Sequence, residues 1–244
     1  MKFGGTSVGT TDAMRQVVSI IKTEKQNWKN LVVVTSALSG VTDLLLKMAS
    51  CSKLPNGESL ESLVKEIYQR HSVIALELIT ERSICEQILM EINDILSHIL
   101  NLCQAITVLG ESTPRVMDTI ASAGERMSVR LLAAALVSSG VAAESVESTH
   151  LIQTDDHYSD AHPNFQESEK QIKNVLLPIL SENIVPVVTG FMAATENGSI
   201  TTLGRGGSDY SAAILGASLP ADDVWIYTDV NGVMTADPRL VPEA

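Results

Sequence analysis

The sequence predicts an α/β fold, a three-layer sandwich in which helices cover both faces of a largely parallel central sheet and a helical excursion leaves that sheet. Short apolar runs such as 31–35 and 184–191 lack polar alternation, as expected of parallel strands buried on both faces. These runs alternate with segments of helical periodicity, which favours strand–helix–strand units. The 244 residues are interpreted as one such domain, which is long enough to bury a core.

The first strand–helix–strand unit spans the first 45 residues. KFGGTSVG at 2–9 predicts a strand end that breaks into a glycine turn, and Thr11 or Asp12 can cap the helix that follows. LVVVT at 31–35 predicts a buried strand, and SALSGVTDLL at 36–45 leads from its end into a helix. Ligands of open α/β sheets bind outside such strand ends, although a plain polar connection is the alternative.

The helical excursion is predicted over residues 58–106. Apolar residues at helical spacing form two stripes with a break near Thr80, which predicts two long antiparallel helices. The stripes are interpreted as core: Leu60, Leu63, Val64, Ile67 and Ile74 in the first helix, and Ile84, Ile88, Ile92, Ile95, Ile99 and Leu102 in the second.

The remaining elements continue the same alternation. Pro114 begins a helical pattern that meets residues 122–136, where Glu125 interrupts small and apolar residues. Its carboxylate can cap the helix or reach a ligand ammonium, and this segment alone favours the cap. Further elements are a helix at 167–180, a hairpin turn at Asn197–Ser199, and strands at 141–146, 184–191 and 223–228.

Composition excludes several classes of partner. The net charge of −12 disfavours nucleic acid and anionic membranes, because both require a basic surface. The chain has no apolar signal core, and no apolar run approaches the roughly 18 residues of a membrane span. Cys51, Cys85 and Cys103 show neither CxxC spacing nor a disulfide framework, so we expect a cytoplasmic protein.

The segment most expected to contain functional residues is TLGRGGSDYSAAIL, at 202–215. Gly204, Gly206 and Gly207 allow a tight turn whose amides can approach an anion. Ser208 is a candidate N-cap for the helical run 210–219, which would aim the positive end of a helix at the same ligand. An ordinary strand-to-helix turn remains the alternative.

The glycine-rich turns together predict a site for two anionic groups. Arg205 suits bidentate bonding to a carboxylate, whereas Lys2 suits a phosphoryl oxygen as a compact charge. The Walker A and HExxH patterns are absent, and no Cys and His pair stands out, which disfavours P-loop chemistry, a cysteine–histidine nucleophile and zinc hydrolysis. A kinase acting on a carboxylate needs none of them, because its acceptor is already ionised at pH 7 and needs only alignment and screening.

The chain resembles the catalytic region of the aspartokinases, in the amino-acid kinase superfamily. The resemblance is closer to the lysine-sensitive and bifunctional aspartokinase/homoserine dehydrogenase types, and it implies the amino-acid kinase, or carbamate kinase-like, fold. It rests on six segments: KFGGTSV (2–8), SGVTDLL (39–45), GERMS (124–128), VVTGF (187–191), TTLGRGGSDYSAA (201–213) and TDVNGVMTADPR (228–239).

The resemblance implies ATP-dependent phosphorylation of the β-carboxylate of L-aspartate to 4-phospho-L-aspartate, the first step towards lysine, threonine and methionine. ATP and Mg²⁺ would be the cofactors, with the metal ligands unassigned, and the full-length protein would be a homo-oligomer. The alternatives are a related kinase of N-acetylglutamate or glutamate, and a noncatalytic module that binds nucleotide or amino acid.

The resemblance also implies residue roles. Lys2 would contact the transferring phosphoryl group, Asp209 would orient Lys2, Glu125 would face the substrate ammonium and Arg205 its α-carboxylate. The remaining substrate positions would be Thr42, Phe191, Thr202, Gly206, Gly207 and Ser208. The nucleotide positions would be Lys2, Phe3, Gly4, Gly5, Thr228, Asp229, Met234 and Arg239.

Three departures from the family pattern stand out. Met1 leaves almost no first strand before Lys2. Met234 occupies the position of a tyrosine that usually lies beside the nucleotide. The family's catalytic region continues beyond the position of Ala244 with a further lysine segment, and paired small regulatory domains follow it. The chain is therefore expected to be a catalytic domain truncated at its C-terminus.

Overall fold

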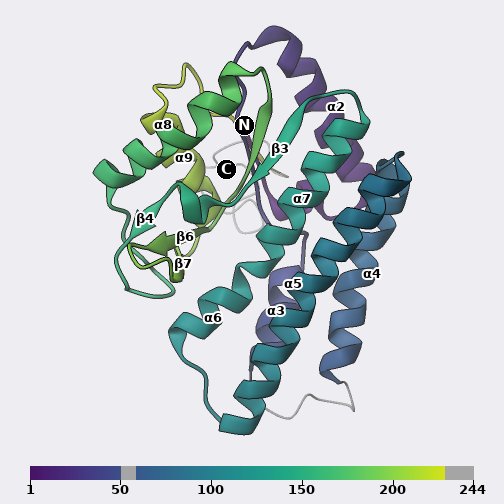
Figure 1. The fold of residues 1–244 in the computed structure, drawn as a ribbon, viewed down its shortest axis with the longest axis vertical. Coiled ribbons are helices and arrows are strands. Elements are labelled where there is room, and N and C mark those ends of the chain that lie inside the picture. The colour runs from purple at the N-terminus through teal and green to yellow at the C-terminus, as the bar shows by residue number, and fades with distance from the viewer. Residues whose placement is uncertain (51–58, 229–244) are drawn as a thin grey trace, which may run out of the picture.

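A computed structural model of the protein describes residues 1–50 and 59–228 (Figure 1). Two short strands and the first three helices open the order of elements, and helices dominate the middle of the chain. The elements are β1 (Lys2–Phe3), α1 (Gly5–Val8), α2 (Thr11–Asn27), β2 (Val33–Thr35), α3 (Val41–Ala49), α4 (Leu60–Leu78), α5 (Arg82–Leu109), α6 (Pro114–Ala121), α7 (Ala123–Ser138), β3 (Ala143–Val146), η2 (Ser148–His150), β4 (Gln153–Thr154), α8 (Phe165–Ser181), β5 (Val185–Thr189), β6 (Met192–Thr195), β7 (Ile200–Thr202), α9 (Gly207–Ser218) and β8 (Ile226–Tyr227).

The central sheet has five strands in the order β3-β5-β2-β1-β8, and every pairing in it is parallel. The expected largely parallel sheet is therefore confirmed. A second sheet of order β4-β6-β7 contains the antiparallel hairpin of β6 and β7, as predicted at Asn197–Ser199. Gly198 adopts a φ of 75° in this turn, a conformation that glycine adopts without a steric penalty.

Helices cover both faces of the central sheet (Figure 1). Successive residues of a strand pack into two different core layers. Val33 and Val187 belong to the layer built with α2, α3, α4, α5 and α7. Val34 and Val188 belong to the other layer, which α8 and α9 complete. The alternation follows from the period of two along a strand, and it produces the predicted three-layer sandwich.

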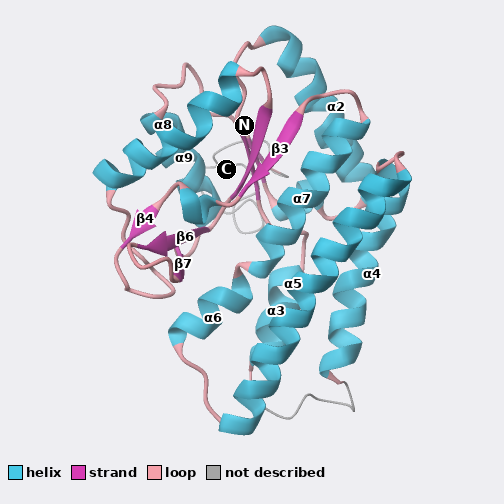
Figure 2. Ribbon diagram, viewed as in Figure 1, coloured by secondary structure: helices cyan, strands magenta, loops and turns pink. Residues whose placement is uncertain are grey.

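The helical excursion consists of α4 and α5, which pack against each other beside α7 (Figure 2). The short connection after Leu78 places the break at Thr80, as predicted, and makes the two helices antiparallel. Both predicted stripes lie in the core or against it, and Ile67, Ile92 and Ile99 are fully buried. Burying a side chain of this size stabilises the fold by about 1.5–3 kcal/mol.

Within the part of the chain that the structure describes, α5 alone is long and apolar enough to cross a membrane by length and composition. Its apolar stripe packs against α4 and α7, while Glu86, Asp94 and His98 are exposed on its outer surface. This is the pattern of an amphipathic core helix.

The structure corrects two predicted helix caps. Thr10, rather than Thr11 or Asp12, caps α2, and its Oγ1 accepts a hydrogen bond from the amide of Ala13. Ser208 does not cap α9: the N-cap is Gly206, with a φ of 77°, and no side chain caps that helix. The hydroxyl of Ser208 instead accepts a hydrogen bond from Ser36, so it cannot be turned back towards the amides of its own helix.

Candidate active site

The carboxyl ends of β1 and β2 bring two of the predicted loops into contact. The amide of Ser39 donates to the carbonyl of Gly5, and the amide of Ser36 donates to the carbonyl of Phe3. A Cβ on Gly5 would lie 2.9 Å from the carbonyl oxygen of Ala37, so only glycine allows this approach. Residues 4–9 and 36–40 therefore form one continuous rim at this edge of the sheet.

Lys2 and Asp209 meet at this rim from opposite ends of the described chain. Lys2 lies in β1, its side chain is 11% exposed, and its Nζ is 2.7 Å from Oδ1 of Asp209 in the first turn of α9. The side chain reaches past Gly4, where an added Cβ would lie 3.6 Å from Nζ. The ion pair fixes the direction of the ammonium group, which is the geometry expected if Asp209 orients Lys2.

Glu125 lies in the first turn of α7 and is 4% exposed. Its Oε1 accepts a hydrogen bond of 3.2 Å from the amide of Ala37, whereas its Oε2 is buried without a partner among the described residues. Burial raises the pKa of Glu125 to about 8, although hydrogen bonds from the amides of Ala37 and Glu125 lower it. A buried carboxylate with one unused oxygen is suited to a cationic ligand.

Ser208 connects α9 to the ends of two central strands. Its Oγ accepts a hydrogen bond of 2.9 Å from Oγ of Ser36, just after β2. A Cβ on Gly190, just after β5, would lie 2.6 Å from Cβ of Ser208. Glycine at 190 thus allows the start of α9 to approach the sheet and brings Ser208 into the rim.

Phe191 and Gly207 are also packed together. Phe191 adopts a φ of 67°, which is uncommon for a residue with a side chain, and its amide donates to Oγ of Ser211. A Cβ on Gly207 would lie 2.9 Å from Cδ2 of the Phe191 ring. The strained backbone is therefore held by the first turn of α9, next to the predicted substrate positions.

Arg205 is exposed on the turn between β7 and α9, and no salt bridge engages it within residues 1–50 and 59–228. Thr42 is half-buried in the first turn of α3, behind the 36–40 loop. Thr202 is buried at the end of β7. The exposed guanidinium of Arg205 is therefore available to an anionic ligand.

The nucleotide positions are only partly described. The ring of Phe3 stacks on that of Tyr227 with centroids 4.6 Å apart, which ties β8 to β1 and places Thr228 at the same edge of the sheet. Asp229, Met234 and Arg239 lie outside the described residues. Among residues 1–50 and 59–228, no group of three or more His, Cys, Asp or Glu side chains is arranged to hold a metal ion.

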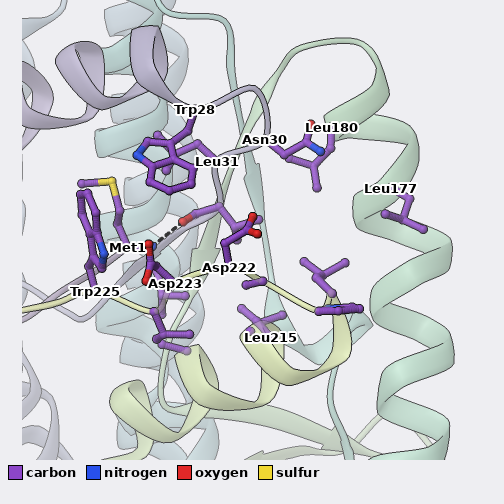
Figure 3. Close-up of a pocket in the computed structure, with 18 residues that line it drawn as sticks. Met1, Trp28, Asn30, Leu31, Leu177, Leu180, Leu215, Asp222, Asp223 and Trp225 are labelled. Atoms are coloured by element: carbon purple, nitrogen blue, oxygen red, sulfur yellow. Dashed lines mark hydrogen bonds between the residues drawn. The ribbon is translucent and has the colours of Figure 1, made fainter.

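A cavity of about 220 Å³ lies at the opposite, amino-terminal edge of the sheet. Figure 3 shows Met1, Trp28, Leu215 and Trp225 around it, and the amino group of Met1 donates to the carbonyl of Val32. These residues precede β1, β2 and β8 or end α9, so the cavity is separate from the rim that carries Lys2 and Glu125.

Sequence reasoning missed two side chains that organise the site. Ser36 belongs to the SALSG segment but has no assigned role there, although it bonds to Ser208. Asp118, on α6, accepts hydrogen bonds from Thr202 and Ser159. A single aspartate in an amphipathic helix carries no motif, so only the three-dimensional arrangement reveals it.

Comparison with known proteins identifies relatives that match the whole of this chain. The chain is 35% identical over 243 residues to the lysine-sensitive aspartokinase 3 of Escherichia coli, and it covers 51% of that protein. It is 34% identical over 244 residues to an aspartate kinase of Pseudomonas putida, of which it covers 44%, and 32% identical to a chloroplastic bifunctional aspartokinase/homoserine dehydrogenase of maize, of which it covers 26%. The chain thus spans a quarter to a half of the length of these relatives.

A solved aspartokinase structure is also similar to this chain over nearly its whole length. The crystal structure of E. coli aspartokinase III in complex with aspartate and ADP matches with a TM-score of 0.88 and 34% identity, over 99% of this chain and 51% of that one. The model of the amino acid kinase family matches residues 1–244. The chain therefore belongs to the amino acid kinase family.

Proposed function

We propose that the protein transfers the γ-phosphoryl group of ATP to the β-carboxylate of L-aspartate, and that residues 1–244 form its catalytic domain. A β-carboxylate oxygen forms a bond to the γ-phosphorus while the bond from that phosphorus to the bridging oxygen breaks. The products are 4-phospho-L-aspartate and ADP. The acceptor is already ionised at neutral pH, so no general base is needed.

The unpartnered Oε2 of Glu125 is the observation that carries this proposal. A buried carboxylate needs a cation or further donors, and the ammonium group of an unmodified α-amino acid supplies both. An N-acetylated acceptor has no ammonium group and would leave this oxygen without a partner. The solved relative that binds aspartate and ADP supports the same choice of acceptor.

The other predicted residues divide between the two ends of aspartate and the phosphates. Arg205 binds the α-carboxylate as a bidentate partner, and Ser208 and Thr42 contact the amino acid beside it. Lys2, held by Asp209, stabilises the negative charge that develops on the transferring phosphoryl group. The amides of Gly4 and Gly5 approach the phosphate oxygens, while Phe191, Thr202, Gly206 and Gly207 shape the substrate side.

ATP would bind beside residues 4–9 and the segment that follows β8, to which the family resemblance assigns Thr228, Asp229, Met234 and Arg239. Phe3 of β1 stacks on Tyr227, the last residue of β8. Mg²⁺ would enter with the nucleotide, held largely by the phosphate oxygens, and would neutralise charge there. The proposed reaction belongs to the biosynthesis of lysine, threonine and methionine, in a homo-oligomer of the full-length protein in the cytoplasm.

The test is formation of aspartyl hydroxamate from aspartate, ATP and hydroxylamine, measured on the longest form of the protein that its gene encodes. Glutamate and N-acetylglutamate serve as competing acceptors. We expect turnover with aspartate only. Absence of an aspartate-dependent signal, or faster turnover with N-acetylglutamate, would contradict the proposal, and ATP binding without turnover would support a noncatalytic module.

Glu125→Gln tests the assigned ammonium partner. Loss of a charge-assisted hydrogen bond costs about 1.5–3 kcal/mol, so the KM for aspartate should rise about 10- to 150-fold while the KM for ATP stays unchanged. The exposed Glu144, on the edge strand β3, provides the matched control Glu144→Gln. An unchanged KM for aspartate in Glu125→Gln would refute this role.

A further inference from the structure

Asp118 has a buried carboxylate that accepts every hydrogen bond the structure gives it. It is 2% exposed on α6. Oδ2 accepts from the amides of Ser159 and Thr202 at 2.9 and 3.0 Å, and Oδ1 accepts from the hydroxyls of the same two residues at 3.3 and 3.0 Å. Four donors match the four lone-pair sites of a carboxylate.

The two partners of Asp118 belong to two segments that border the proposed aspartate site. Thr202 ends β7, three residues before Arg205, and its carbonyl accepts a hydrogen bond from the amide of Ala161. Ser159 adopts a φ of 75°, and the neighbouring Asp160 lies against Gly204, where an added Cβ would be 2.4 Å from its Oδ1. Asp118, the 155–162 loop and the turn that carries Arg205 therefore form one junction.

The same helical segment also carries Glu125. α6 ends at Ala121 and α7 begins at Ala123, and Ser122 is the C-cap of the first helix and the N-cap of the second. Asp118 thus holds the Arg205 turn from a point seven residues before Glu125. Among the residues that the structure describes, no cation forms a salt bridge with Asp118, so its contribution is made through hydrogen bonds from neutral donors.

We propose that Asp118 is a positioning residue that sets the spacing between Arg205 and Glu125, and so between the partners of the α-carboxylate and the ammonium group of the substrate. The inference rests on the proposed function, which assigns those two partners. Asp118 touches neither the substrate nor the nucleotide in this assignment. Its removal should weaken aspartate binding and leave nucleotide binding intact.

Asparagine and alanine at this position separate hydrogen-bond geometry from charge. In Asp118→Asn the amide oxygen can accept from both backbone amides, and the NH₂ group can donate to both hydroxyls, because Ser and Thr hydroxyls accept as well as donate. Asp118→Ala removes all four hydrogen bonds. We expect the KM for aspartate to rise about 10- to 100-fold in Asp118→Ala and less than about threefold in Asp118→Asn, at an unchanged KM for ATP.

Hydrogen exchange at the amides of Ser159 and Thr202 gives a readout that does not depend on activity. Exchange should accelerate in Asp118→Ala and stay near the wild-type rate in Asp118→Asn. Ser168→Ala is the matched control, because it removes a buried hydroxyl of α8 that bonds to the backbone of Gln153 on β4, the edge of the small sheet opposite β7. This control should lose stability and keep its KM for aspartate.

The outcomes are distinguishable. An unchanged KM for aspartate in folded Asp118→Ala, an equal loss in Asp118→Asn, or a parallel rise in the KM for ATP would each overturn the inference. If Asp118→Ala does not fold, the same measurements on Asp118→Ser decide, with an unchanged KM contradicting the proposal. Wild-type protein without aspartate-dependent turnover would refute the proposed function instead, and unaltered amide exchange in Asp118→Ala would then refute the junction itself.

Discussion

Glu125 is protonated in most molecules of the free protein at pH 7, because burial raises its pKa to about 8. An ammonium group placed beside Oε2 would favour the ionised form and bring this pKa down. Binding of the cation and loss of the proton are therefore linked, and the affinity for aspartate should increase as pH rises from about 6 to about 8.

The first prediction follows from this linkage. Aspartate binding at pH 7 should release close to one proton in the wild type and almost none in Glu125→Gln, since the amide cannot titrate. Calorimetric titration in buffers of different ionisation enthalpy measures the number directly. Proton uptake, or equal release by both proteins, would show that Glu125 does not ionise on binding.

Gly124 provides the second prediction at the residue scale. A Cβ there would lie 2.6 Å from Cβ of Ala37, so Gly124→Ala should push the 36–40 loop away from α7 and lengthen the bond from Ala37 to Glu125. We expect a loss of about 1–3 kcal/mol of stability and a raised KM for aspartate. The double variant Gly124→Ala with Ala37→Gly should recover both, and failure to recover would exclude the steric explanation.

At the scale of helices and strands, sequence periodicity predicts most of the structure, while helix ends need local geometry. The stripes of α4 and α5 were identifiable because their isoleucines and leucines repeat at helical spacing and face one core. The cap of α9 was predicted wrongly because serine is a preferred N-cap residue, whereas the helix begins two residues earlier, after Gly206 in a left-handed conformation. The hydroxyl of Ser208 is used by Ser36 instead, a contact that only the three-dimensional structure reveals.

The packing of α5 provides the third prediction. Ile92 is fully buried at the centre of this helix, so Ile92→Ala should lower the free energy of unfolding by about 2–5 kcal/mol. Leu76→Ala on α4, whose side chain is 69% exposed, is the control and should change stability by less than about 0.5 kcal/mol. Denaturant unfolding measures both, and similar effects in the two variants would contradict this assignment of the core.

At the scale of the whole molecule, the sequence predicts the layered α/β architecture because unbroken apolar runs mark strands that are covered on both faces. It cannot predict that the Asp118 junction forms, since α6, the 155–162 loop and β7 are far apart in the chain. The pairing of Lys2 with Asp209 was predicted only through family resemblance. Its geometry depends on the position of β1 between β2 and β8.

The fourth prediction concerns the stability of the central sheet. β2 and β5 lie inside the sheet with every residue buried, whereas β8 is at the edge of the described sheet, with Ile226 49% exposed and Tyr227 half-buried. Amides of β2 and β5 should therefore exchange by global unfolding, and those of β8 by local opening at much faster rates. Equal protection of β8 and β5 would indicate that the sheet opens as a single unit.

The strand order also fixes when this fold can be completed during synthesis. β1 is made before the other described strands, yet one of its two edges pairs with β8, which begins at Ile226, whereas β1 ends at Phe3. At about 5–20 residues per second this interval lasts roughly 11–45 s. Throughout that time the nascent chain exposes an unpaired strand edge beside Lys2, and a chaperone that shields such edges would act within this interval.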